Sequence, residues 1–374
     1  MKHTYPSVSR RAMFNKWRIM LRSHHFILRA ITVLLLPVSL LAIIAGCAPE
    51  HASLPPRHAP PFPIVTTENL FAVHAPDKTN IWIVGFNGSI THSSDGGNRW
   101  QFQKSGVDLN LCDVSFVSPQ RGWIAGRAGT ILHTSDGGKT WTKQKSTTDK
   151  HLFAIWFVDE INGLAAGDFG TIIHTRDGGK TWVSQGTGED KIYNDIFFID
   201  RQHGWLVGEF GLIYHTSDGG IRWELQECKD IIPVVDVTEW KTPTPSLYSV
   251  WFTDTHHGWA TGMDATIIAT QDGGRTWQKL KNPAENNKIT LYKIVIREGS
   301  GWVVGQKGTY LYSNDNGKSW ADRSRFTNTK FWLMDISFPD KLRGWAVGSR
   351  GTIIKTEDSG KTWNMLSGVP LSFK

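Results

Sequence analysis

Residues 122–141 read GWIAGRAGTILHTSDGGKTW, and this stretch contains two short apolar runs, a turn bracketed by glycines, and a closing Asp-Gly-Gly-Lys-Thr-Trp element. Short apolar runs that are interrupted by turn signals are typical of β-strands joined in hairpins. The glycines on either side of Arg127 and Ala128 fit a tight turn that needs positive φ. The stretch therefore predicts two antiparallel strands, 122–126 and 129–134, then a sharp turn and a further strand that begins at Trp141.

The closing element recurs along the chain in the form Ser/Thr-x-Asp-x-Gly-x-x-Trp. Its tryptophans are Trp100, Trp141, Trp182, Trp223, Trp277, Trp320 and Trp363, and their spacings are 41, 41, 41, 54, 43 and 43 residues. A period of ~40–45 residues is that of a four-stranded propeller blade. An apolar run such as 111–116 precedes each unit and supplies an innermost strand. The sequence therefore predicts an all-β protein, a seven-bladed β-propeller whose four-stranded antiparallel blades have strands a to d from the inside outward.

Two sets of repeated side chains have structural roles in this interpretation. Six of the seven units have Trp as the second residue of strand b, with Leu164 as the exception, and we expect these rings to fill the space between blades. The repeated element resembles the Asp-box of bacterial neuraminidases, and its carboxylates can accept N–H and hydroxyl groups across the c–d turn. Equivalent positions around a ring cannot converge on one substrate, so we expect structural roles for Asp95, Asp136, Asp177, Asp218, Asp272, Asp315 and Asp358.

The charge of the chain is concentrated at its start. The formal net charge is +7, but residues 1–47 hold seven of the 41 basic side chains and no acidic one, which leaves 34 basic against 34 acidic groups in the remainder. A body without net charge argues against a nucleic-acid partner. The basic start and the apolar run 30–46 that follows it are typical of an export signal.

The end of the apolar run predicts the processing of the chain. It reads Ile44-Ala45-Gly46-Cys47, which resembles the bacterial lipobox. We expect a lipoprotein signal peptide at 1–46, lipid attachment at Cys47, a proline-rich tether at 47–66, and a propeller at 67–370. The body would then be extracytoplasmic and lipid-anchored, on the periplasmic side of a bacterial membrane or in the cell envelope. An uncleaved membrane anchor is the alternative, since ~18 apolar residues can begin to span a bilayer.

One face of the predicted propeller carries the b–c turns and the d–a loops, and the Asp-boxes lie on the other. The 54-residue spacing marks an insertion on the first face at about 227–245, which contains Trp240. The b–c turns there are acidic in blades 3 to 5 and basic in blades 6, 7 and 2, with Asp168, Glu209, Asp264, Lys307, Arg350 and Arg127. We hypothesise that Trp240 and these charges bind and orient a protein partner. Packing of the insertion on its own blade and scattered solvated charges are the alternatives.

The start of strand a lies beside the central channel. The equivalent position in the seven blades reads Ala72, Asp113, Ala154, Asp195, Ser249, Tyr292 and Asp335. Because the three aspartates belong to blades 2, 4 and 7, we expect water-bonded groups at the channel mouth and not an acid–base pair, which needs a separation of ~5–10 Å. Four histidines share one place in strand c, but neighbouring blades fan apart, so His92, His133, His174 and His215 cannot meet at one metal ion. We expect no catalytic residue, metal or cofactor, and separate thiols at Cys112 and Cys228.

The Gly-Trp-x-x-Gly and Gly-Thr-Ile-Ile strands and the Asp-Gly-Gly-Lys-Thr-Trp turn together resemble the photosystem II stability and assembly factor family, seven-bladed propellers with Asp-box repeats. The resemblance covers residues 69–365. It implies a non-enzymatic, monomeric assembly factor whose partner is a protein such as a subunit of a membrane complex. The alternative is a carbohydrate-binding or glycoside-hydrolase propeller, since sialidases and xyloglucanases also use Asp-boxes. The Arg-Ile-Pro segment of sialidases does not occur in this sequence. Related xyloglucanases build their cleft from two propellers, whereas this chain supplies one.

Overall fold

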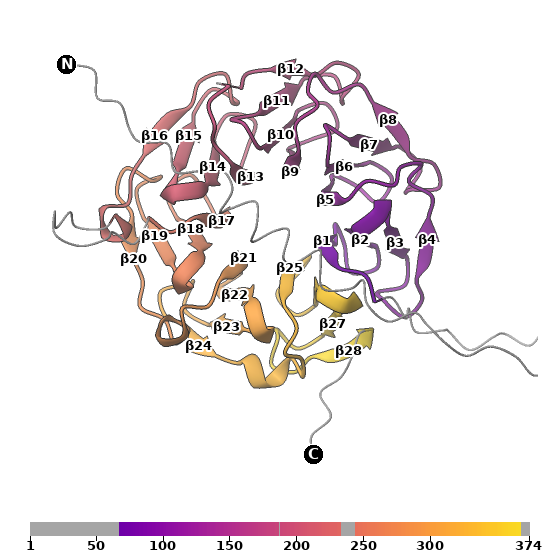
Figure 1. Ribbon diagram of the computed structural model, residues 1–374. Coiled ribbons are helices and arrows are strands. Elements are labelled where there is room, and N and C mark those ends of the chain that lie inside the picture. The colour runs from indigo at the N-terminus through magenta and orange to yellow at the C-terminus, as the bar shows by residue number, and fades with distance from the viewer. Residues whose placement is uncertain (1–66, 187, 233–243, 368–374) are drawn as a thin grey trace, which may run out of the picture. The chain divides into compact units, whose positions relative to one another are not determined.

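The computed structural model describes residues 67–186, 188–232 and 244–367. They form seven four-stranded antiparallel sheets, arranged as blades around a central axis (Figure 1). In every sheet the strands lie side by side in chain order, with strand a nearest the axis and strand d at the rim. The predicted seven-bladed propeller with Asp-box c–d turns is confirmed.

Each of the first four blades has short inner strands and an even shorter strand at the rim. Blade 1 comprises β1 (Leu70–His74), β2 (Ile81–Gly85), β3 (Ile90–Ser93) and β4 (Gln101–Gln103); blade 2, β5 (Leu111–Phe116), β6 (Gly122–Gly126), β7 (Ile131–Thr134) and β8 (Thr142–Gln144); blade 3, β9 (Leu152–Phe157), β10 (Gly163–Gly167), β11 (Ile172–Thr175) and β12 (Val183–Ser184); blade 4, β13 (Tyr193–Phe198), β14 (Gly204–Gly208), β15 (Ile213–Thr216) and β16 (Glu224–Gln226).

The last three blades follow the same plan. Blade 5 comprises β17 (Leu247–Phe252), β18 (Gly258–Gly262), β19 (Ile267–Thr270) and β20 (Gln278–Lys279); blade 6, β21 (Leu291–Arg297), β22 (Ser300–Gly305), β23 (Tyr310–Ser313) and β24 (Ala321–Asp322); blade 7, β25 (Leu333–Ser337), β26 (Gly344–Gly348), β27 (Ile353–Thr356) and β28 (Asn364–Ser367). The helical segments of the described residues are 3₁₀ turns: η1 (Phe86–Gly88), η2 (Glu209–Gly211), η3 (Lys229–Ile231), η4 (Met263–Ala265), η5 (Glu285–Asn287), η6 (Gln306–Gly308), η7 (Ser324–Phe326) and η8 (Ser349–Gly351).

Blade 7 meets blade 1 without any exchange of strands, since each blade consists of four consecutive strands. The junction uses the same bonds as the other junctions. Asp335 accepts a hydrogen bond from the Val73 N–H at 2.7 Å, as Asp113 accepts one from the Ile155 N–H at 2.8 Å. The Gly351 N–H likewise donates to the Glu68 carbonyl at 2.7 Å. The ring therefore closes by ordinary contacts between neighbouring blades.

Aromatic side chains fill the space between blades, as predicted for the tryptophans. At the junction of blades 1 and 2, Phe116 stacks on Trp82 of strand b with ring centroids 3.7 Å apart, and Trp141 of the next Asp-box meets Phe116 edge-on at 6.0 Å. Trp82 is fully buried. Offset-stacked and edge-to-face pairs contribute about 0.5–1.5 kcal/mol beyond the burial of their area. This three-ring arrangement is the main packing unit of the propeller.

The glycines around the b–c turn have two different causes. Gly129 has φ of +64°, and a Cβ there would lie 1.9 Å from the Thr148 carbonyl oxygen. In the first glycine of the pair the backbone is extended instead, and a Cβ at Gly126 would lie 2.5 Å from the Asn110 carbonyl oxygen. Positive φ was therefore the wrong explanation for the first glycine, which is needed because strand b passes close to the start of strand a.

The Asp-box carboxylates close the c–d turns. Asp136 accepts hydrogen bonds from the Thr134 hydroxyl at 2.8 Å, the Thr140 N–H at 2.9 Å and the Thr140 hydroxyl at 2.7 Å. The bonds from Thr140 are the main reason why the pKa of Asp136 is lowered to about 2. Corresponding bonds form at Asp95, Asp177, Asp218, Asp272, Asp315 and Asp358. All the donors belong to the turn itself, so these carboxylates stabilise the hairpin.

Candidate functional site

The face of the propeller that carries the b–c turns and the d–a loops is called the turn face below. The second residue of each b–c turn is its exposed tip and has left-handed φ of 50° to 57°: Asn87, Ala128, Phe169, Phe210, Asp264, Lys307 and Arg350. The residue before each tip is half-buried. Of the charged turn residues predicted from sequence, Asp264, Lys307 and Arg350 are therefore exposed tips, whereas Arg127, Asp168 and Glu209 are half-buried.

Two of the half-buried carboxylates bind their own blades. Asp168 accepts a hydrogen bond from the His151 N–H at 2.8 Å, and Glu209 accepts one from the Ile192 N–H at 3.1 Å. Burial raises the pKa of both carboxyls and outweighs the opposing effect of these hydrogen bonds. The two residues thus orient the d–a loop, a role that their charge pattern alone did not predict.

Apolar tips on blades 3 and 4 were missed because the turns were compared by charge. Phe169 and Phe210 are 38% and 50% exposed, and the Lys150 ammonium lies 5.0 Å from the Phe169 ring centroid. Near Phe210, a pocket of about 180 Å³ is lined by further apolar side chains that include Leu225 and Ile232. The available sequence signal was a phenylalanine at the tip position in each of two consecutive blades. The turn face therefore combines exposed aromatic and charged tips.

The described ends of the predicted insertion pack against blades 4 and 5. Ile231 is buried, and the Asp230 carboxylate accepts a hydrogen bond from the N–H of Lys279 in β20 at 3.0 Å. Cys228 is a buried free thiol, and Cys112 is a half-buried one. Trp240 lies outside the described residues, as does Cys47.

Asp113, Asp195 and Asp335 lie at equivalent places near the axis, but the equivalent residue of blade 6 is Lys293 and not Tyr292. The β21–β22 register pairs Lys293 with Val304, as Asp335 pairs with Val347 in blade 7. The turn between these strands is one residue shorter than expected, so that counting back from the strand-b tryptophan identified Tyr292 incorrectly. We call Asp113, Asp195, Asp335 and Lys293 the axis cluster.

The axis cluster is bonded within the protein. Lys293 Nζ lies 3.1 Å from the Asp195 carboxylate, which also accepts a hydrogen bond from the Val250 N–H of blade 5 at 3.1 Å. Both oxygens of each aspartate accept a backbone N–H, one from the following residue and one from the neighbouring blade. The aspartates thereby link the innermost strands of adjacent blades.

Burial governs the protonation of the axis cluster. It raises the pKa of Asp113 to about 7 and that of Asp335 to about 6, although the charge of Lys293 opposes both shifts. Burial alone would lower the pKa of Lys293, but the charges of Asp195, Asp335 and Asp113 outweigh it and raise that pKa. A positive charge is therefore held among three carboxyl groups.

Three of the four strand-c histidines contact tryptophans, and the fourth, His174, pairs across the strands with Leu164. His92, for example, stacks on Trp82 with ring centroids 4.2 Å apart. Within the described ranges, no group of three or more His, Cys, Asp or Glu side chains is placed to hold a metal ion. In the same part of the chain, no helix has the length and apolar character that a membrane span requires.

Solved structures with the same fold include two kinds of protein. YCF48 bound to a D1 peptide shares 21% identity at a TM-score of 0.65 over 81% of this chain and 99% of that chain. YCF48 from Cyanidioschyzon merolae shares 17% identity at 0.63 over 79% and 97%. The GH74 xyloglucanase from Xanthomonas campestris shares 10% identity at 0.65 over 81% of this chain and 55% of that chain. At these identities the similarity shows the fold alone.

Sequence comparison is more specific. The photosystem II assembly protein Ycf48 of Thermosynechococcus vestitus is 39% identical over 51 residues, which are 13% of this chain and only 15% of that protein. A family model described as photosynthesis system II assembly factor YCF48 matches residues 100–189, 185–242 and 233–329. Because these three matches together span more than half of the chain, the chain belongs to the family of photosynthesis system II assembly factor YCF48.

Proposed function

We propose that this chain is a non-enzymatic assembly factor that binds an extracytoplasmic segment of a membrane-complex subunit on its turn face. The observation that carries the proposal is the pair of exposed aromatic tips, Phe169 and Phe210, of which Phe210 lines a pocket with Leu225 and Ile232. Exposed aromatic groups next to a pocket are typical centres of protein interfaces. Family membership supports the assembly role, and a similar fold, YCF48, has been solved with a D1 peptide.

The charged tips give the partner its orientation in this proposal. Asp264 lies on blade 5, and Lys307 and Arg350 lie on blades 6 and 7, so that charge changes sign around the face. Such a pattern affects encounter rate and register more than affinity. Trp240 and Arg127 are further contacts in this proposal. Lipid attachment at Cys47, followed by the tether 47–66, would hold the propeller near its membrane partner.

In this proposal the axis aspartates have structural and not catalytic roles. All six carboxylate oxygens of Asp113, Asp195 and Asp335 accept backbone hydrogen bonds. A general acid or base needs an oxygen within reach of a substrate proton. The alternative of a glycoside hydrolase predicts turnover of a xyloglucan oligosaccharide or a sialoside by the purified chain, and we expect none.

The test is recovery of the partner after crosslinking in membranes that contain the full chain. Phe210→Ser should lower recovery about tenfold or more, because aromatic anchors dominate interface energies. Leu342→Ser is the matched control, since Leu342 is 48% exposed in the a–b turn of blade 7 on the opposite face. Lys307→Glu with Arg350→Glu should slow association at low salt. Equal recovery with Phe210→Ser and wild type, or equal loss with Leu342→Ser, would contradict the proposal.

A further inference from the structure

Five of the six strand-b tryptophans are covered by a side chain from strand c of the same blade. The covering groups are three imidazoles, one phenol and one ammonium: His92 on Trp82 at 4.2 Å, His133 on Trp123 at 4.9 Å, His215 on Trp205 at 5.0 Å, Tyr312 on Trp302 at 6.5 Å, and the Lys355 Nζ at 6.0 Å from the Trp345 centroid. Every covering group is therefore aromatic or cationic, and all have polar atoms.

Trp259 of blade 5 is the exception among these rings. Its cross-strand neighbour is Ala269, in the register that pairs Trp205 with His215 in blade 4. Trp259 is 6% exposed, whereas each of the other five rings is at most 1% exposed. A single methyl group thus stands where the other blades place a planar or charged group.

Two further substitutions open the same junction between blades 5 and 6. Strand a of blade 6 has Ile296 where blade 5 has Phe252, which stacks on Trp205 at 3.4 Å. Leu280 occupies the place of Gln226, which accepts a hydrogen bond from Trp277 Nε1 at 3.3 Å. The buried Trp320 Nε1 consequently has no hydrogen-bond partner within the described residues. The junction lacks three groups that fill the junction before it.

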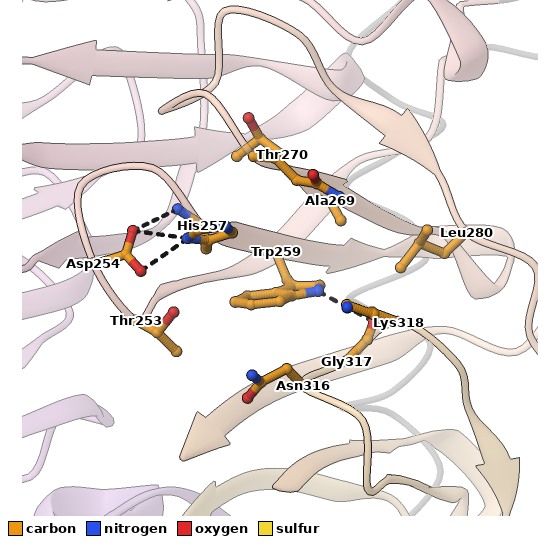
Figure 2. Close-up of a pocket in the computed structure, with 11 residues that line it drawn as sticks. Thr253, Asp254, His257, Trp259, Ala269, Thr270, Leu280, Asn316, Gly317 and Lys318 are labelled. Atoms are coloured by element: carbon orange, nitrogen blue, oxygen red, sulfur yellow. Dashed lines mark hydrogen bonds and ion pairs between the residues drawn. The ribbon is translucent and has the colours of Figure 1, made fainter. Parts of the chain in front are cut away.

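A pocket of about 400 Å³ occupies the vacated space. It lies on the Asp-box side, between the a–b turn of blade 5 and the Asp-box of blade 6, and Figure 2 shows Trp259 at its centre with Ala269 on one side and Asn316 on the other. Asp254 and His257 form one wall, and Asp254 lies 2.9 Å from His257 Nδ1. Burial would raise the pKa of Asp254, but hydrogen bonds from His256 and His257 outweigh it and lower that pKa, which favours the ionised carboxylate in this wall.

We propose that this pocket binds an arginine side chain of a protein partner. The guanidinium is planar and cationic, and so combines the two properties of the groups that cover the equivalent rings in the other blades. Stacked on Trp259, it would have the Asp254 carboxylate and the Asn316 side-chain amide in the lining for its N–H groups. Lys318 is the opposing charge in the lining and is exposed, where solvent screens it. The site goes beyond the proposed function, because it lies on the face opposite the turn face.

The test uses ¹⁹F NMR of the full chain labelled with 5-fluorotryptophan, in which Trp259→Phe identifies the Trp259 signal. The probe is Gly-Gly-Arg-Gly-Gly with blocked ends, and its matched control has neutral citrulline in place of arginine. We expect the arginine peptide to shift the Trp259 signal saturably at millimolar concentration, and the citrulline peptide to bind about fivefold more weakly. The proposal is overturned if no saturable shift occurs, or if citrulline or a neutral disaccharide binds equally well.

The blocking variant is Ala269→His, which supplies the group that covers Trp205 in blade 4. It should abolish the shift and leave the signals of the other tryptophans unchanged; equal binding by this variant would overturn the proposal. If the Ala269→His variant does not fold, Ala269→Lys is used in its place, because Lys355 covers Trp345 in the same way in blade 7. Lys318→Ala should strengthen binding of the arginine peptide, because it removes the like charge from the lining, and weaker binding would contradict the proposal. Ala269→His leaves the turn face intact. The partner-recovery experiment with this variant therefore tests the proposed function independently of the arginine site.

Discussion

The junction between blades 4 and 5 and the junction between blades 5 and 6 share a backbone plan but differ in how they are filled. At the first, Phe252 lies between Trp205 and Trp277, with His215 beyond. At the second, both tryptophans are kept as Trp259 and Trp320, but Ile296 and Ala269 replace the phenylalanine and the histidine, and a pocket is present. Near the axis both junctions keep their bonds: the Val250 N–H donates to Asp195, and Trp251 Nε1 donates to the Ile296 carbonyl at 2.8 Å. The inner contacts are therefore present at both junctions, and the difference between the junctions lies in the outer packing.

The largest effect is expected from deleting the ring at the filled junction. Trp205→Ala should lower the free energy of unfolding by about 3–5 kcal/mol, because a fully buried indole leaves a large cavity. Trp259→Ala should cost about 2 kcal/mol less, since its ring already borders a pocket. Urea unfolding of both variants gives the comparison. Equal losses would show that the two junctions are equally well packed.

Exchanging the strand-a residues Phe252 and Ile296 should make the packing of the two junctions more alike. Phe252→Ile removes a stacked contact and an edge contact, and should destabilise the fold by about 1–2 kcal/mol. Ile296→Phe should raise stability by about 1 kcal/mol, because it restores the stack on Trp259. Thermal unfolding midpoints measure both changes. A larger loss from Ile296→Phe than from Phe252→Ile would mean that the backbone of blade 6 has adjusted to the smaller side chain.

A further prediction concerns pH and the inner contacts. The folded-state pKa of Asp113 is raised to about 7, so its protonated form favours the folded state at low pH, and this stability is lost as pH rises from about 4 through 7. Asp113→Asn should therefore flatten the pH dependence of stability in that window. Ser249→Ala at the junction of blades 5 and 6, where a hydroxyl accepts the Ile294 N–H at 3.4 Å, should leave the slope unchanged. Urea midpoints between pH 4 and 8 compare the two; a parallel slope in Asp113→Asn would contradict the assignment.

The period of the repeats was sufficient to predict the propeller, the strand order and the roles of the Asp-boxes, because these depend on residues that recur in every blade. Departures from the repeat were harder to predict. The two-residue turn Glu298-Gly299, with φ of 48° and 84°, shortens blade 6 and displaced the expected axis residue from Lys293 to Tyr292. The pocket at Trp259 is lined by Ala269 and Leu280, and Ile296 belongs to the same hydrophobic cluster as Trp259; these residues become neighbours only once adjacent blades pack.

Closure of the ring without exchanged strands bears on how such a protein changes in evolution. A duplicated segment of about 41 residues carries all four strands of a blade and the side chains that meet both neighbours, as Asp113 does for Ile155 and Asp335 for Val73. Unequal recombination between repeats can thus add or delete a blade as a unit. Divergence after duplication then acts on outer positions such as Ala269, so a gene made of near-identical copies can acquire a binding site at one junction alone.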